Sequence, residues 1–249
     1  MTSPSATPTT YGLLGMLAVR SWTGYELTQQ VRRSLRFVWP TSEGHLYREQ
    51  RRLVELGWAR VEEEPAGART RKRYFVTPAG RTALATWLAT EPEEPHFQIE
   101  GVLRAFYADQ GSADDLGRSL RTTAAMADDM LAELVGYAAE YLEEGGPLWL
   151  LEQGRGTEDD RQPFHGRPMF PERLHSVALA IEVTTSLLGT LHDFFQRGAE
   201  EVDAWPSTTD PALTESTRAR LQRVVDRHPR RPAGDPAVDP ASADEGAGE

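Results

Sequence analysis

Residues 42–57 have the sequence Ser-Glu-Gly-His-Leu-Tyr-Arg-Glu-Gln-Arg-Arg-Leu-Val-Glu-Leu-Gly, which is typical of a helix with a defined start and end. Thr41 or Ser42 can cap its first turn, and Gly57 is the residue type that most often ends a helix. Helical spacing turns one set of side chains inward. The inward positions are Leu46, Gln50, Leu53 and Val54.

The flanking sequence predicts two helices before this one and a hairpin after it. Leu13, Leu14 and Leu17 share one face of a short helix, and Thr23 to Glu26 form a capping box for a second helix. Residues 58–62 and 72–76 alternate with the period of strands, and Thr77-Pro78 begins a fourth helix. This order of elements predicts a winged helix-turn-helix, with residues 42–57 as the recognition helix and a two-stranded wing.

Two groups of polar and basic residues are candidate DNA contacts of such a fold, because arginine can bind guanine edges and phosphates. A solvated basic surface is the alternative. Glu43 and Glu49 reduce the positive charge, and Tyr47 and Tyr74 fit either packing between recognition helix and wing or base stacking. The candidates on the helix are Ser42, His45, Arg48, Arg51 and Arg52, and those on the wing are Arg69, Arg71, Lys72 and Arg73.

The charge of the chain is divided unevenly between its two parts. Residues 1–90 hold 13 Lys and Arg against 7 Asp and Glu, a net charge of +6, whereas residues 91–249 hold 14 against 31, a net charge of −17. The total of −11 therefore conceals a basic N-terminal module, which is what a nucleic-acid partner requires.

Several motifs across residues 10–90 resemble, in order and spacing, the PadR family of bacterial transcription regulators. They are Tyr11-Gly12-Leu13-Leu14, Gly24-Tyr25-Glu26-Leu27, Ser42-Glu43-Gly44-His45-Leu46-Tyr47, Arg52-Leu53-Val54-Glu55-Leu56-Gly57-Trp58 and Arg73-Tyr74-Phe75-Val76-Thr77-Pro78-Ala79-Gly80. The sequence departs from the family at residues 48–50, where Pro and an apolar pair usually follow the tyrosine. The resemblance implies a repressor whose long C-terminal helices form a dimer.

The rest of the chain predicts a second, helical domain. Residues 91–95 form an acidic Pro-containing linker, and residues 96–228 a helical dimerisation and effector domain with a long loop at 145–170. Its seam consists of Leu116, Leu120, Thr123, Ala127, Met130, Leu134, Tyr137 and Tyr141. We expect residues 1–9 to be flexible and residues 229–249 to be disordered.

Other function classes find little support in the sequence. It has no cysteine, no signal peptide and no apolar run near the ~20 residues that span a bilayer, so we expect a cytoplasmic protein without a membrane partner. Motifs for an enzyme, a metal site or a cofactor are not found. Aromatic residues such as Phe164, Phe170 and Phe194, with His165, His175 or His192, fit either a core or an effector pocket.

We therefore predict a mostly α-helical, homodimeric regulator that binds double-stranded DNA at a palindromic operator. It is expected to be a repressor that a small-molecule effector or a partner releases. The alternative is a winged-helix interaction or ligand-binding module that does not read DNA, which the departure at residues 48–50 would permit.

Overall fold

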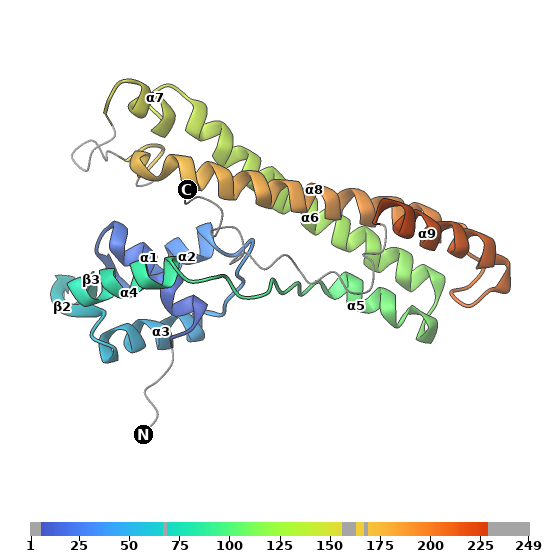
Figure 1. Cartoon of the computed structure of the whole chain (residues 1–249), viewed down its shortest axis with the longest axis horizontal. Coiled ribbons are helices and arrows are strands. Elements are labelled where there is room, and N and C mark those ends of the chain that lie inside the picture. The colour runs from blue at the N-terminus through green and yellow to red at the C-terminus, as the bar shows by residue number, and fades with distance from the viewer. Residues whose placement is uncertain (1–5, 67–68, 156–162, 167–168, 229–249) are drawn as a thin grey trace, which may run out of the picture. The chain divides into compact units, whose positions relative to one another are not determined.

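The computed structural model describes residues 6–66, 69–155, 163–166 and 169–228 (Figure 1). The predicted disordered tail and residues 1–5 of the predicted flexible N-terminus lie outside this part of the chain. In chain order the elements are α1 (Pro8–Val19), β1 (Trp22–Thr23), α2 (Gly24–Ser34), α3 (Glu43–Glu55), β2 (Ala59–Ala66), β3 (Arg69–Val76), α4 (Pro78–Leu88), α5 (Glu100–Phe106), α6 (Ala113–Leu142), α7 (Pro147–Glu152), α8 (Leu174–Val202) and α9 (Thr214–Arg227).

Side-chain caps fix the starts of the N-terminal helices. Thr23 accepts a hydrogen bond from the Glu26 amide, and the Glu26 carboxylate accepts one from the Thr23 amide at 2.8 Å. Ser42 caps α3, and Thr77 caps α4 directly before Pro78. These caps confirm the predicted helix starts, because each satisfies an amide that the first turn leaves free.

The sheet of the winged helix has the order β1-β3-β2. β2 and β3 form the predicted wing, antiparallel from Ala59↔Val76 to Ala66↔Arg69. β1 was not predicted: Trp22 and Thr23 pair with Tyr74 and Arg73 of β3. The structure thus adds a short third strand to the two-stranded wing.

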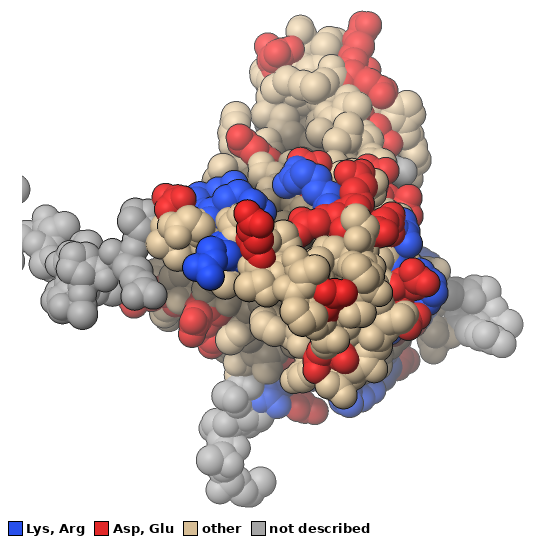
Figure 2. All heavy atoms as spheres, turned by 90° about the vertical axis from the view of Figure 1, so that its right-hand side faces the viewer, with Lys and Arg blue, Asp and Glu red and all other residues tan. Residues whose placement is uncertain are grey.

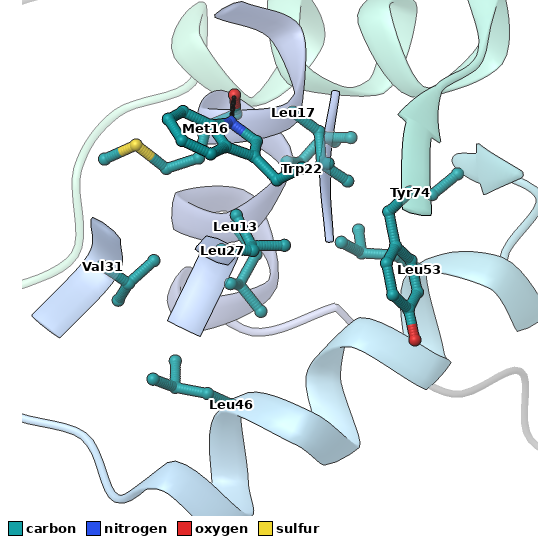
Figure 3. Packing of buried hydrophobic residues seen from close by; sticks show 11 residues of the cluster. Leu13, Met16, Leu17, Trp22, Leu27, Val31, Leu46, Leu53 and Tyr74 are labelled. Atoms are coloured by element: carbon teal, nitrogen blue, oxygen red, sulfur yellow. Dashed lines mark hydrogen bonds between the residues drawn. The ribbon is translucent and has the colours of Figure 1, made fainter. Parts of the chain in front are cut away.

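The core of the winged helix lies between α1, α2, α3 and β3 (Figure 3). Leu46 and Leu53 of α3 are fully buried in it, and Tyr74 of β3 lies beside Leu53 (Figure 3). The Trp22 indole donates to the Met16 carbonyl at 2.9 Å, which satisfies the one polar group of this side chain. Val54 is 38% exposed, so the prediction that it faces inward was wrong. Glu49, which was not predicted to face inward, is buried.

The chain divides into two compact units, and α6 and α8 contribute to both. The first unit contains residues 1–98 and 127–190, and the second contains residues 99–126 and 191–249. In the second unit, Leu116, Leu120 and Ala124 of α6 pack on Phe195, Ala199 and Val202 of α8. Much of the predicted seam is therefore buried within the chain itself.

Two features of the C-terminal helices differ from the sequence analysis. The predicted loop at 145–170 contains α7, which begins at Pro147 and buries Leu150. The helical segment Pro171–Val202 is long and apolar enough to cross a membrane by length and composition, with a mean hydropathy of 1.4 over 18 residues, of which 17% are buried. Instead of an uninterrupted apolar run, this segment has small and hydroxyl residues between its leucines and valines.

Candidate nucleic-acid interface

The recognition helix α3 has one face buried and the opposite face exposed. Leu46, Glu49, Gln50 and Leu53 are buried, whereas Arg48 and Arg51 are exposed. The first set lies within about a quarter of the helix circumference, because 3.6 residues make one turn. Arg48 and Arg51 therefore project from the side that faces away from the core.

Two buried polar side chains hold the inner face of α3 in place. The Gln50 amide donates to the Gly24 carbonyl at 3.0 Å and to the Thr28 hydroxyl at 2.9 Å, both on α2. The Glu49 carboxylate accepts from the Thr10 hydroxyl of α1 at 2.5 Å. Glu49 thus does not lie on the candidate DNA-binding surface, where the sequence analysis placed its charge.

Of the other candidates at the recognition helix, two are less exposed than Arg48 and Arg51 and the third, Ser42, is the N-cap residue. His45 and Arg52 are half-buried, and the His45 Nδ1 lies 3.2 Å from the Arg48 Nη2. Ser42 is exposed, and its hydroxyl accepts from the His45 amide at 3.3 Å. Glu43 pairs with Arg32 of α2, which neutralises the carboxylate closest to the start of the helix.

The basic side chains of the wing differ in their exposure and in their ion pairs. Lys72 and Arg71 are exposed, but the Arg71 Nε donates to the Glu64 carboxylate at 2.5 Å. Arg73 is only 19% exposed, and its guanidinium binds the same carboxylate through two hydrogen bonds. The backbone of Arg69 lies in β3, and its side chain is outside the described part of the structure.

The two tyrosines of the recognition helix and wing have different environments. Tyr74 is 7% exposed and belongs to the core, where burial raises the pKa of its hydroxyl. Tyr47 is 38% exposed. Packing therefore accounts for Tyr74, whereas Tyr47 remains available at the surface beside Arg48.

A cavity of about 440 Å³ lies in the first unit. Its lining combines aromatic and aliphatic side chains with two arginines, Arg33 of α2 and Arg173, one carboxylate, Glu140, and two tyrosines, Tyr137 and Tyr141 of α6. Burial, followed by the charge of Glu140, raises the pKa of Tyr141 and keeps its hydroxyl protonated. A cavity with an apolar lining and a few polar groups is typical of a small-molecule site.

Few residues of this cavity are predicted from the sequence. Of the aromatic residues considered for an effector pocket, Phe164 and Phe170 line it. Arg33, Arg173, Tyr137 and Tyr141 were missed as a group, because they are far apart in sequence. The one available signal was the pair Tyr137 and Tyr141, four residues apart, which gives polar ends to an otherwise aliphatic seam.

Acidic residues dominate the surface charge of the C-terminal part. Figure 2 looks onto the side of the molecule where α9 lies in Figure 1, and Asp and Glu are spread over this face with Lys and Arg in a few groups. Residues 91–249 carry a net charge of −17. A net negative charge of this size disfavours phosphates, which leaves the exposed arginines of α3 and the cations of the wing as the candidate interface.

Comparisons with known proteins agree with this geometry. Residues 13–86 match the transcriptional regulator PadR-like family. A probable transcriptional regulator of Mycobacterium tuberculosis is 30% identical over 86 residues, which are 34% of this chain and 45% of that protein. The chain thus spans less than half the length of this curated relative.

Solved structures show that the fold extends beyond the winged helix. A Streptococcus mutans protein has a TM-score of 0.60 at 16% identity, over 76% of this chain and 96% of its own. Bacillus subtilis PadR in complex with operator DNA has a TM-score of 0.57 at 16% identity, over 80% and 99% of the two chains. The same protein in complex with p-coumaric acid has a TM-score of 0.50 at 16% identity, over 81% and 100%. At this identity the likeness establishes the fold alone.

Proposed function

We propose that this chain, whose residues 13–86 form a PadR-like transcriptional regulator domain, is a sequence-specific DNA-binding repressor that acts as a homodimer in the cytoplasm. The observation that carries the proposal is the exposure of Arg48 and Arg51 on α3, while Gln50 and Glu49 hold the opposite face of this helix. A helix presented in this way can enter a major groove, where arginine binds the O6 and N7 atoms of guanine.

The candidate residues contact two different parts of the DNA, the base edges and the phosphates. Arg48 and Arg51 contact base edges. Ser42, His45 and Arg52 lie beside them at the edges of the exposed face of α3. Lys72 and Arg71 bind phosphates from the wing, with Arg69 at its tip. Two copies of α3 occupy successive major grooves of a palindromic operator, about 34 Å apart.

The dimer forms through exposed apolar side chains of the C-terminal helices. Leu179, Val183 and Leu187 lie four residues apart on α8 and are 68%, 54% and 44% exposed. Because a soluble monomer rarely leaves such a row uncovered, a second copy of the chain is its proposed partner. Leu116, Leu120 and Leu134 of the predicted seam are buried within one chain, so they are not the side chains that a second copy would cover.

An effector binds in the cavity of the first unit and releases the repressor from DNA. The two arginines, Arg33 and Arg173, outnumber the one carboxylate of Glu140 and so favour an anionic ligand, and the apolar lining favours an aromatic one. The relative from Bacillus subtilis has been solved with p-coumaric acid, which is an aromatic carboxylic acid. Since Arg33 lies on α2 and Phe170 contacts Trp22 at 6.2 Å between ring centroids, a ligand there touches elements that position α3.

An electrophoretic shift experiment tests the function. The full chain is titrated against the duplex that flanks its own coding region and against an unrelated duplex of equal length and composition. Tighter binding to the first duplex is the expected result, with a specificity ratio of ~10³ or more at physiological salt. Equal binding to both would favour an interaction module that does not read DNA.

A further inference from the structure

The wing contains a partly buried ionic connection that leads away from its exposed tip. Arg73 Nε lies 2.8 Å from Glu64 Oε2, and Arg73 Nη2 lies 3.0 Å from Glu64 Oε1, which is a bidentate contact between β3 and β2. The third nitrogen, Nη1, donates to the Ser21 carbonyl at 3.3 Å and lies 3.5 Å from Glu26 Oε2. All three guanidinium nitrogens of Arg73 are therefore bonded within the protein.

These contacts join the wing to the start of the helix-turn-helix. Ser21 directly precedes β1, whose Thr23 pairs with Arg73 and caps α2. Glu26 belongs to the same cap, because its carboxylate accepts from the Thr23 amide. The side chain of Arg73 thus connects Glu64 in the wing with the first turn of α2, and Gln50 connects that turn with α3.

The pKa shifts of Glu64, Arg73 and Glu26 agree with an Arg73 charge that is paired within the protein. Hydrogen bonds from Arg73, and then from Arg71, hold the pKa of the Glu64 carboxyl below its ordinary value. The same contact with Glu64 raises the pKa of Arg73. Burial raises the pKa of Glu26, but the hydrogen bonds from Thr23 and the charges of Arg73 and Arg20 outweigh it.

Arg71 and Lys72 are placed differently from Arg73. Arg71 shares Glu64 through its Nε, but its side chain is 52% exposed. Lys72 points to the other face of the hairpin, is exposed, and forms no ion pair within the described residues. Both cations can reach a phosphate without breaking the connection to α2.

We infer that Arg73 is a positioning residue, which sets the angle of the wing against the helix-turn-helix. Arg71, by contrast, exchanges its hydrogen bond with Glu64 for a contact with a DNA phosphate when DNA binds. The inference rests on the proposed DNA-binding function. It separates two arginines that lie two positions apart on one strand and that the sequence does not distinguish. The fork of Arg73 is essential to the connection, since lysine cannot bind one carboxylate in the bidentate way.

Salt dependence of DNA binding distinguishes a phosphate contact from a positioning role. The full chain and its Arg71→Gln, Lys72→Gln, Arg73→Gln and Arg73→Lys variants are titrated with the duplex flanking the coding region over a series of salt concentrations. Arg71→Gln and Lys72→Gln should each lower the log-log slope by about 0.9 per protomer. Arg73→Gln and Arg73→Lys should weaken binding at every salt concentration while the slope stays that of the parent protein.

Hydrogen exchange tests the positioning role without DNA. Amides of β2 and β3 should exchange at least ~5-fold faster in Arg73→Gln, Arg73→Lys and Glu64→Gln than in the parent, because the wing loses charge-assisted bonds that oppose local opening. Lys72→Gln is the matched control and should exchange like the parent. Glu64→Gln retains both guanidiniums, so it serves where an Arg73 variant does not fold.

The two experiments separate failure of the inference from failure of the function. Unchanged exchange in Arg73→Gln and Glu64→Gln would overturn the positioning role whether or not the chain binds DNA. A slope lowered as much by Arg73→Gln as by Arg71→Gln, with full affinity in Arg73→Lys, would make Arg73 a phosphate contact. If the parent protein does not bind the duplex, the proposed function fails and the exchange measurement still decides the role of Arg73.

Discussion

The Gln50 side-chain amide of α3 lies 3.0 Å from the Gly24 carbonyl oxygen of α2, deep in the winged helix. The same amide donates to the Thr28 hydroxyl at 2.9 Å. Gly24 permits this approach, because a Cβ there would stand 2.9 Å from Gln50 Oε1. One buried amide therefore sets the spacing between the two helices of the helix-turn-helix, and with it the presentation of Arg48 and Arg51.

Gln50→Leu should destabilise the N-terminal domain. The substitution keeps the volume but leaves the Gly24 carbonyl and the Thr28 hydroxyl with fewer buried partners, at a cost of about 1–3 kcal/mol in the free energy of unfolding. Urea denaturation of the full chain, followed by tryptophan fluorescence, measures it. Glu55→Gln on the exposed face of the same helix is the control. Equal unfolding midpoints for all three proteins would refute the role given to Gln50.

Replacing two helical glycines by alanine should change the free energy of unfolding in opposite directions. A Cβ at Gly80 of α4 would lie 2.2 Å from the Trp58 carbonyl oxygen, whereas one at Gly15 of α1 would meet nothing within 4 Å. Gly80→Ala should lower the free energy of unfolding by about 1–3 kcal/mol or more through overpacking. Gly15→Ala should raise it by about 1 kcal/mol, since alanine is the better helix former. Thermal unfolding of both variants gives the signs, and the same sign for both would contradict the close approach of Gly80 to the Trp58 carbonyl.

The sequence predicts those parts of the fold that have local signals. Thr23, Ser42 and Thr77 mark helix starts through caps that involve neighbouring residues, and the period of the wing strands is visible in the chain itself. β1 has two residues, which is too short to show a period. Glu49 is buried because Thr10, 39 positions away, offers it a hydroxyl, and no local pattern carries that information.

The candidate site, too, could be predicted only where the sequence carries a local signal. Exposure of Arg48 and Arg51 follows from the helix period once Leu46 and Leu53 are placed in the core. The difference between Arg71 and Arg73 depends on Glu64 across the hairpin and on Glu26 of α2, so it becomes visible only in three dimensions. The cavity, whose lining comes from distant segments, is likewise a property of the folded chain.

The cavity should bind a planar aromatic carboxylate. With p-coumarate as the probe, we expect a rise in the melting temperature of the full chain, and binding at least ~10-fold weaker in the Arg33→Gln, Arg173→Gln double variant, which loses charged hydrogen bonds worth about 1.5–3 kcal/mol each. Arg32→Gln, which alters a cation outside the cavity lining, is the control. No response to p-coumarate or benzoate in the parent would remove the proposed ligand class, and equal binding in the double variant would move the site elsewhere.

Dimerisation should depend on the outer face of α8. Val183→Asp with Leu187→Asp places two charges in the proposed interface, where burial of an unpaired carboxylate is costly. Sedimentation equilibrium should then show a monomer at concentrations where the parent is a dimer. Ala178→Asp, at an exposed position of the same helix that lies off this row, tests whether added charge alone has this effect. A double variant that remains dimeric would place the contact between copies on another surface.

DNA binding by the exposed face of α3 is the central claim, and a fluorescence-anisotropy titration of one labelled duplex tests it most directly. The duplex is the segment flanking the coding region that the parent protein protects in footprinting. Arg48→Ala with Arg51→Ala should weaken binding by ~10²-fold or more, because each bidentate contact to a base is worth about 1–3 kcal/mol per half-site. The melting temperature should stay within about 2 °C of the parent, since both side chains are exposed. Unchanged affinity of this double variant, with the parent bound to the duplex, would contradict the assignment of α3 as the element that reads DNA.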